Sequence, residues 1–125
     1  DASRLAGVPC DVTRIADVER LWALASERFG KVDVWINNAG VVNEHARHAL
    51  VDVPAGELAS IVETNVVGAL YGSKVALAGM RRQGFGALYN MEGFGSRGRQ
   101  FRTGLTPYGT TKAAVRYLTE ALARE

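Results

Sequence analysis

Residues 31–40 read KVDVWINNAG, and this stretch decides the fold class. Its centre, VDVWI, is rich in β-branched and aromatic residues, which is typical of a strand. Two asparagines, an alanine and a glycine follow, and such residues end a strand in a tight turn. The stretch therefore predicts a strand whose carboxyl end carries polar side chains and an approachable backbone.

The segments on both sides of this strand alternate between strand-like and helix-like patterns. Apolar residues recur at helical spacing before it and twice after it. In chain order we expect a strand at 5–12, a helix from Thr13 to Gly30, the strand within 31–40, a loop at 41–56, a helix from 57 to about 82, a strand at 87–91, a loop at 92–106 and a helix from Pro107 to the end. Thr13 can cap the first of these helices, and Thr106 fits the N-cap of the last one.

This alternation predicts an α/β fold in which parallel strands are joined by right-handed helical crossovers. Ligands of such sheets bind beyond the carboxyl ends of the strands, where Asp11, NNAG (37–40) and EGFGS (92–96) fall. No glycine-rich phosphate loop precedes the first strand. We therefore expect residues 1–125 to be one partial domain, internal to a larger α/β domain.

Composition excludes several functional classes. The chain has 15 Lys and Arg against 13 Asp and Glu, a net charge of +2. This charge is too small to argue for a nucleic acid or membrane partner. No window approaches the ~20 apolar residues that span a bilayer, and no secretory signal opens the chain. Cys10 is the single cysteine, so no internal disulfide forms, and we expect a cytoplasmic location.

The stretch TPYGTTK (106–112) places Tyr108 and Lys112 four residues apart in a predicted helix. Residues at this spacing share one helix face. A tyrosine alone is a poor acid–base catalyst near neutrality, but a neighbouring ammonium favours its ionised form. The pair could donate a proton to a carbonyl oxygen or remove one from an alcohol. An exposed amphipathic turn would show the same spacing.

Two further motifs accompany this pair. The small residues of NNAG would let a flat ligand approach the backbone, although a turn capped by asparagine side chains is the alternative. Asn65, in ETNVVGAL, lies on an apolar helical face. A buried asparagine needs hydrogen-bond partners, so Asn65 is either a structural bridge or part of a polar relay.

Over essentially its whole length, the chain resembles the short-chain dehydrogenase/reductase family. The resemblance rests on the order and spacing of five motifs: CDVT, NNAG, ETNVVG, GALYNM and YGTTK. The resemblance implies a Rossmann-type doubly wound parallel sheet with flanking helices, incomplete here because its N-terminal glycine-rich βαβ unit and its C-terminal part are absent. It also implies bound NAD or NADP, hydride exchange between a carbonyl and an alcohol on a small molecule, and a homo-oligomer built on the helices at 57–82 and 107–125.

The resemblance also assigns roles to residues. Cofactor-binding residues would be Asp11, Val12, Asn38, Ala39, Gly40, Tyr108 and Lys112. Tyr108 would be the general acid/base, Lys112 would hold the nicotinamide ribose and favour the phenolate, and Asn65 would anchor a water in the proton relay.

One residue of the family pattern is displaced. The family carries a serine at the end of the strand before the tyrosine, and here that run reads NMEGFGS (90–96). Ser96 takes this role if Gly93 and Gly95 fold the loop back; otherwise the role is lost, or Glu92 alters the pocket. A serine there would share the developing charge on the substrate oxygen. The same loop resembles the chlorophyll b reductase branch of the family and its bacterial relatives.

Two other features invite weaker hypotheses. His45 and His48 are three residues apart but lack the further ligands that a metal site needs. The arginines of GSRGRQFRTG interleave with Phe101, a pattern that could bind single-stranded nucleic acid, although an anionic or flat substrate fits better. The displaced serine also motivates an alternative hypothesis: the chain belongs to a regulatory or scaffold protein that binds a dinucleotide but does not turn over a substrate.

Overall fold

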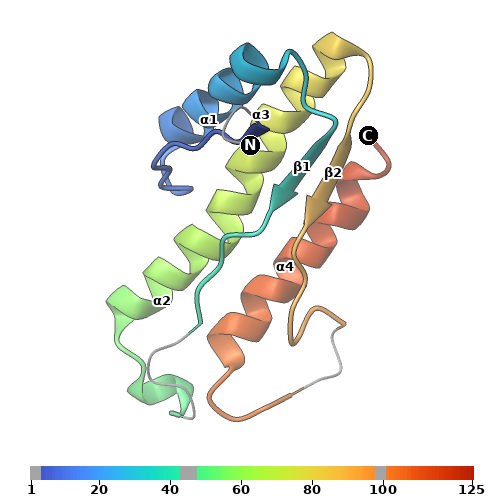
Figure 1. Cartoon of the computed structure of the whole chain (residues 1–125). Helices are drawn as coiled ribbons and strands as arrows, with labels where there is room; N and C mark the ends of the chain where they lie inside the picture. Colours follow the sequence, from blue (N-terminus) through green and yellow to red (C-terminus); the bar gives the residue numbers. More distant parts are fainter. Residues whose placement is uncertain (1–3, 43–47, 98–100) are drawn as a thin grey trace.

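The computed structural model describes residues 4–42, 48–97 and 101–125 (Figure 1). Its elements, in chain order, are α1 (Ile15–Phe29), β1 (Val34–Asn37), a short 3-10 helix η2 (Leu50–Asp52), α2 (Ala55–Val62), a π-helical turn η3 (Glu63–Val67), α3 (Gly68–Gln83), β2 (Ala87–Asn90) and α4 (Thr106–Leu122).

The two strands form a parallel pair. Val34 lies opposite Ala87 at one end, and Asn37 lies opposite Asn90 at the other. Parallel neighbours require a crossover connection, which α2, η3 and α3 supply. The prediction of parallel strands joined through helices is confirmed, and both strands end at the same edge of the sheet.

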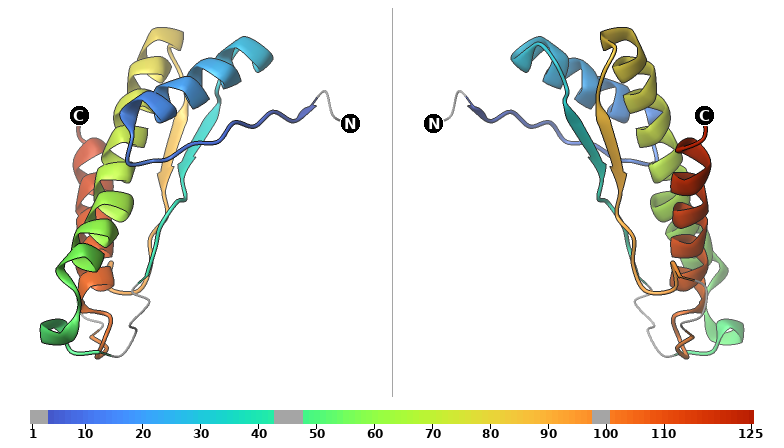
Figure 2. Two further views of the ribbon diagram at one scale, coloured as in Figure 1. Left: turned by 90° about the vertical axis from the view of Figure 1, so that its left-hand side faces the viewer. Right: turned by 90° about the vertical axis from the view of Figure 1, so that its right-hand side faces the viewer.

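The helices α3 and α4 lie together on one side of the strands (Figure 2). Along β1, exposed Val34 and Ile36 alternate with half-buried Trp35 and Asn37, as the two-residue period of a strand requires. The half-buried pair faces α3, since the Asn37 side chain donates a hydrogen bond to the Ala69 carbonyl. This face of the sheet is therefore the one that the helices cover.

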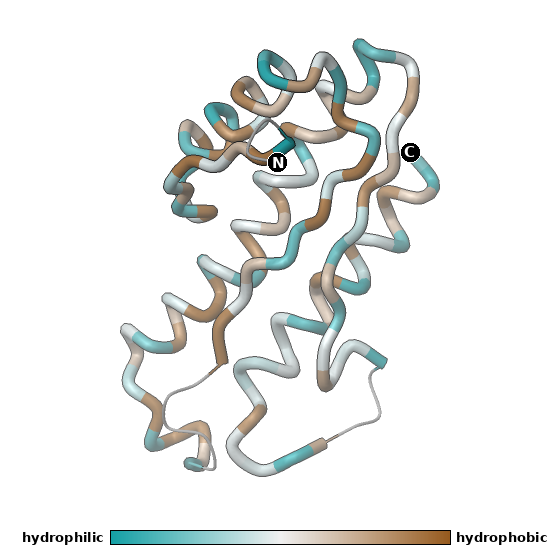
Figure 3. Tube along the Cα trace, viewed as in Figure 1, coloured by the Kyte–Doolittle hydropathy of each residue, from teal (hydrophilic) through white to brown (hydrophobic). Residues whose placement is uncertain are grey.

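A buried apolar cluster lies where α1 meets α3 and the start of β1. Trp22, Val32, Ala76 and Met80 form it, with Trp35 packed against them. The rings of Trp22 and Trp35 are 5.7 Å apart. Along α1, hydrophobic and hydrophilic residues alternate with the turns of the helix, so that one side of α1 enters this cluster (Figure 3).

The long helix predicted at 57–82 is present but is not uniform. It starts at Ala55 and contains the π-helical turn η3 around Asn65. A π-turn inserts one extra residue into a helix and is frequently found at functional sites. Helical periodicity alone does not reveal such an insertion.

Three local predictions are wrong. Residues 5–12 form no strand, because no segment of the described chain pairs with them, and Leu5 is exposed. Thr13 does not cap α1, because its amide and hydroxyl both donate to the Asp11 carboxylate and close a turn before the helix. Thr106 is not the N-cap of α4 but its first residue, after Leu105. Within the described residues, no helix is long and apolar enough to cross a membrane.

Candidate active site

A pair of asparagines joins the carboxyl ends of the two strands. The Asn37 amide donates to Asn90 Oδ1 at 2.8 Å and to Ser73 Oγ of α3 at 3.1 Å. The Asn90 amide in turn donates to Thr119 Oγ1 of α4 at 2.9 Å. Both strand ends are therefore tied to the two helices behind them.

Tyr108 and Lys112 lie side by side on α4, as their spacing predicts. Lys112 Nζ is 5.7 Å from the centre of the Tyr108 ring. The Lys112 residue is only 5% exposed, and its ammonium donates to the Met91 carbonyl at 2.9 Å. Burial lowers the pKa of Lys112 below its ordinary value, because desolvation penalises the charged form. A poorly hydrated cation thus stands beside the phenol at the end of β2.

Gly93 brings the loop after β2 into contact with this pair. A Cβ atom at Gly93 would lie 2.4 Å from Tyr108 Oη and 3.2 Å from Lys112 Cε. Only a residue without a side chain leaves the Tyr108 hydroxyl in its place. The backbone of the loop therefore forms one wall around the hydroxyl.

Asn65 connects the loop after β1 to the region of Tyr108 and Lys112. Its residue is 2% exposed, and its Oδ1 accepts the Val41 amide at 2.7 Å while its Nδ2 donates to the Val41 carbonyl at 2.9 Å. A Cβ atom at Gly40 would lie 3.3 Å from Asn65 Oδ1 and 3.5 Å from Lys112 Nζ. Gly40, Asn65 and Lys112 thus converge, and the structure brings together three residues from separate sequence motifs.

Three of the four remaining residues predicted to bind the cofactor line a cavity of about 160 Å³, and the fourth, Asp11, does not. Val12, Asn38 and Ala39 line it together with Trp35 and the small residues of α3. A Cβ atom at Gly68 would meet Val12 Cγ2 at 2.7 Å, so the chain after Asp11 packs closely on the start of α3. Hydrogen bonds from Thr13 lower the pKa of the Asp11 carboxyl.

Ser96 is buried and lies in the loop after β2, which folds back on α4. Gly95 adopts φ of +92°, and a Cβ atom there would lie 2.6 Å from the Cα of Gly109. The Ser96 hydroxyl donates to the Glu92 carboxylate at 3.1 Å. The structure therefore brings Ser96 to Glu92, and Gly93 is the strand-end residue that lies against the Tyr108 hydroxyl.

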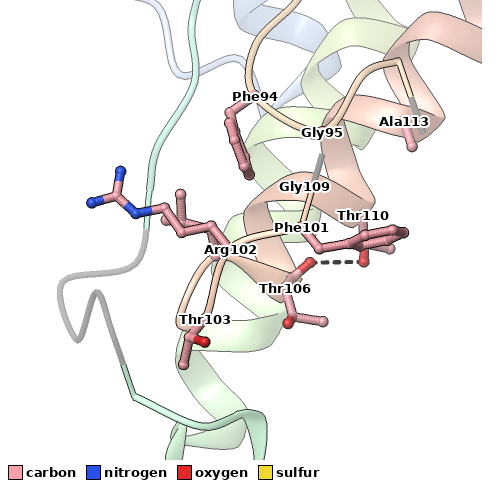
Figure 4. A pocket seen from close by; sticks show the side chains of 10 residues that line it. Phe94, Gly95, Phe101, Arg102, Thr103, Thr106, Gly109, Thr110 and Ala113 are labelled. Carbon is pink, nitrogen blue, oxygen red and sulfur yellow. Dashed lines mark hydrogen bonds between the residues drawn. The ribbon is translucent and has the colours of Figure 1, made fainter. Parts of the chain in front are cut away.

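A larger cavity, of about 520 Å³, lies against α4 (Figure 4). The helical residues that line it are on a different face of α4 from Tyr108 and Lys112. Thr106, Gly109, Thr110 and Ala113 line its helical side, and this spacing of three and four residues marks one helix face. Phe94, Gly95, Phe101, Arg102, Thr103 and Leu105 complete its walls. Neither Tyr108 nor Lys112 lines this cavity, so it is separate from the space beside the tyrosine hydroxyl.

The histidine and arginine hypotheses are only partly covered by the structure. His45 and Arg99 fall outside the described residues. Among the residues that are described, no group of three or more His, Cys, Asp or Glu side chains could hold a metal ion.

The structure is a parallel α/β fold of the Rossmann type, with a tyrosine–lysine pair near the carboxyl ends of its strands. The chain belongs to the short-chain dehydrogenase/reductase family, since the family model described as "Enoyl-(Acyl carrier protein) reductase" matches residues 1–125. The family resemblance of the sequence and the Rossmann-type fold are thereby confirmed.

Individual relatives agree with this assignment. The "Probable chlorophyll(ide) b reductase NYC1, chloroplastic" of Oryza sativa subsp. japonica is 38% identical over 125 residues, which are 98% of this chain and 24% of that protein. The solved structure "ElxO with NADP Bound" matches at a TM-score of 0.86 and 27% identity, over 94% of this chain and 46% of that one. "Crystal Structure of NAD+-Bound Xylitol Dehydrogenase" matches at a TM-score of 0.81 and 31% identity, over 91% of this chain and 42% of that one.

The chain thus spans about a quarter of its plant relative and under half of either solved structure. The plant relative also agrees with the resemblance of the NMEGFGS loop to the chlorophyll b reductase branch.

Proposed function

We propose that the protein is an NAD(P)-dependent oxidoreductase that exchanges a hydride between its cofactor and a small carbonyl or alcohol substrate. The single observation that carries this proposal is the buried Lys112 ammonium beside the Tyr108 phenol, where the loops after both strands meet. Two similar solved structures, one with NADP bound and one with NAD⁺ bound, support the cofactor.

The residues present fit a flat dinucleotide at the strand ends. Gly40 has no side chain, and any Cβ there would crowd Asn65 and Lys112. Val12, Asn38 and Ala39 line the neighbouring cavity, which is suited to the adenosine end. Lys112 would hold the nicotinamide ribose, and the bound nicotinamide supplies or accepts the hydride.

The residues of the chain supply the proton. In carbonyl reduction the Tyr108 hydroxyl donates its proton to the substrate oxygen as the hydride reaches the carbon, which leaves an alcohol and a tyrosine phenolate. The Lys112 ammonium stabilises the phenolate, and because its surroundings exclude water this attraction is stronger than at the surface. Asn65 would anchor a water that returns the proton by accepting a hydrogen bond from it, because both side-chain amide protons are already donated to Val41 and Thr111. Alcohol oxidation runs the same steps backwards.

The test is Tyr108→Phe in the full-length protein, with Tyr117→Phe as its control. Tyr117 lies on the same helix but is 75% exposed. We expect Tyr108→Phe to lower turnover about 10²- to 10⁴-fold, the usual contribution of a general acid–base group, while cofactor affinity stays the same. Tyr117→Phe should retain full turnover. Equal turnover in the wild type and Tyr108→Phe contradicts the proposal.

The hydrogen bond from Ser96 to Glu92 favours a second candidate function. The hydroxyl proton of Ser96 already has an acceptor, so it is not offered to a substrate oxygen. A protein that binds a dinucleotide but turns over little would keep such an arrangement. Calorimetry with NADPH and NADH, combined with a broad screen of carbonyl compounds, separates the two: tight binding without oxidation of the cofactor favours a regulatory or scaffold protein.

We also propose that the full-length protein is a homo-oligomer. Leu70 and Leu77, seven residues apart on α3, are 45% and 38% exposed, and Tyr117 on α4 is more exposed still. These side chains would be covered if the two helices met a second copy. Light scattering on the full-length protein measures its mass, and a monomer at micromolar concentration would contradict this proposal.

A further inference from the structure

Thr111 lies between Tyr108 and Lys112 in sequence, yet its side chain faces the interior. It is 2% exposed. Its hydroxyl donates to the Tyr108 carbonyl at 2.7 Å and accepts a hydrogen bond from Asn65 Nδ2 at 2.9 Å. A hydroxyl has one proton, so the direction of both bonds is fixed. Thr111 is therefore the link between the first turn of α4 and the π-helical turn η3.

This link completes the hydrogen bonding of the Asn65 amide. One Nδ2 proton goes to the Val41 carbonyl and the other to Thr111, while Oδ1 accepts the Val41 amide. The oxygen and the nitrogen of the side chain cannot exchange places without losing both bonds to Val41 and reversing the one to Thr111. Removing the Thr111 hydroxyl would leave a buried amide proton without an acceptor, and only the two bonds to Val41 would then hold Asn65.

The link also sets the position of the tyrosine. The first two turns of α4 are held on one side by Lys112, which donates to the Met91 carbonyl after β2, and on the other by Thr111, which meets Asn65 beside the loop after β1. Tyr108 lies in the first of these turns. Its hydroxyl is therefore placed between the two loops by one bond to each side.

We propose that Thr111 is a positioning residue for the reaction: its hydroxyl holds the Asn65 amide and the first turn of α4 in the one arrangement that aligns Tyr108 with the substrate. This inference rests on the proposed function. Thr111 touches neither substrate nor cofactor in it, and acts through Asn65 and Tyr108.

The same helix offers a matched control in Thr119. The Thr119 hydroxyl donates to the Val115 carbonyl at 2.9 Å and accepts from the Asn90 amide at 2.9 Å. It thus makes the same two kinds of bond, with a carbonyl of its own helix and with an asparagine amide. Thr119 lies about two turns beyond Thr111 and about three turns beyond Tyr108 along α4. Valine at either position keeps the shape of threonine and removes the hydroxyl.

The experiment compares Thr111→Val, Thr111→Ser and Thr119→Val in the full-length protein. For Thr111→Val we expect kcat to fall roughly 10- to 100-fold, because small misplacements of reacting groups cost rates of this size, while KM and the cofactor Kd stay within about threefold. Thr111→Ser restores the hydroxyl and should recover kcat to within about threefold. Thr119→Val should lower Tm but retain kcat. Equal kcat in Thr111→Val and Thr119→Val, or no recovery in Thr111→Ser, overturns the inference.

A second measurement needs neither turnover nor a stable variant. The side-chain amide protons of Asn65 should exchange with solvent much more slowly than those of exposed Asn38 in the wild-type protein, as followed by NMR. Equal exchange rates would mean that Asn65 is not held, and would overturn the inference. A wild type without carbonyl reduction would instead refute the proposed function, and this exchange rate would then decide the hydrogen-bonding claim alone.

Discussion

Replacement of Gly93 by alanine should inactivate the protein without unfolding it. The added Cβ would lie 2.4 Å from Tyr108 Oη, whereas ordinary contacts begin near 3.4 Å, so the hydroxyl or the loop must move by about 1 Å. Misplacement of a catalytic group by about 1 Å can cost roughly 10²-fold in rate. The displaced atom is the far end of a side chain, so we expect the loss of unfolding free energy to stay below about 1.5 kcal/mol.

The assay is steady-state oxidation of the reduced nicotinamide by a responsive carbonyl compound, together with urea unfolding. Gly56→Ala is the control, because a Cβ atom there meets nothing within 4 Å. We expect Gly56→Ala to match the wild type in turnover. Wild-type turnover in Gly93→Ala would refute the placement of the Tyr108 hydroxyl against the loop after β2.

Two further predictions concern stability. Gly79→Ala would place a Cβ atom on the Trp22 ring in the apolar cluster, so unfolding in urea should show a loss of about 1–3 kcal/mol; an unchanged midpoint would contradict this packing. Burial lowers the pKa of Lys112 from 10.5, so between its lowered value and 10.5 the unfolded chain binds more protons than the folded one. The free energy of unfolding should therefore rise with pH in that window. Urea titrations over a pH series measure this rise, and Lys112→Met, which lacks the titrating group, is the comparison. Parallel curves for the two proteins would contradict the burial of the ammonium.

The sequence predicted those parts of the fold that depend on local pattern. The β-branched run before NNAG and the helical spacing of apolar residues correctly placed β1, β2 and the helices between and after them. Residues 5–12 show the limit of this reasoning, because a strand exists only where a neighbour completes its hydrogen bonds. Their apolar composition favours an extended, buried strand, but it does not provide the neighbouring strand that would pair with them.

The candidate site was predictable where the chemistry lies in the residue types themselves. Tyr108 and Lys112 share a helix face, and the structure brings them together with Asn65 and Gly40. Thr111 was missed because its role comes from the partner across the fold, Asn65 in a π-helical turn that periodicity does not show. A polar residue three positions after the tyrosine, on the side of α4 that is buried, was the available signal.

The sequence did not predict the hydrogen bond between Asn37 and Asn90 at the strand ends, for a similar reason. Asn37 and Asn90 meet only because the parallel register places them opposite each other. Register depends on the pairing of two strands that are 53 residues apart, as their hydrogen bond shows, and neither stretch specifies it alone.

The most direct test of the central claim is a crystal structure of the full-length protein with its nicotinamide cofactor and a bound alcohol or ketone. We predict that the substrate oxygen lies about 2.6–3.2 Å from Tyr108 Oη, on the side where Gly93, Lys112 and Gly40 converge. A substrate seated instead in the cavity lined by Phe94 and Phe101, on the other face of α4 and out of reach of that hydroxyl, would contradict the account.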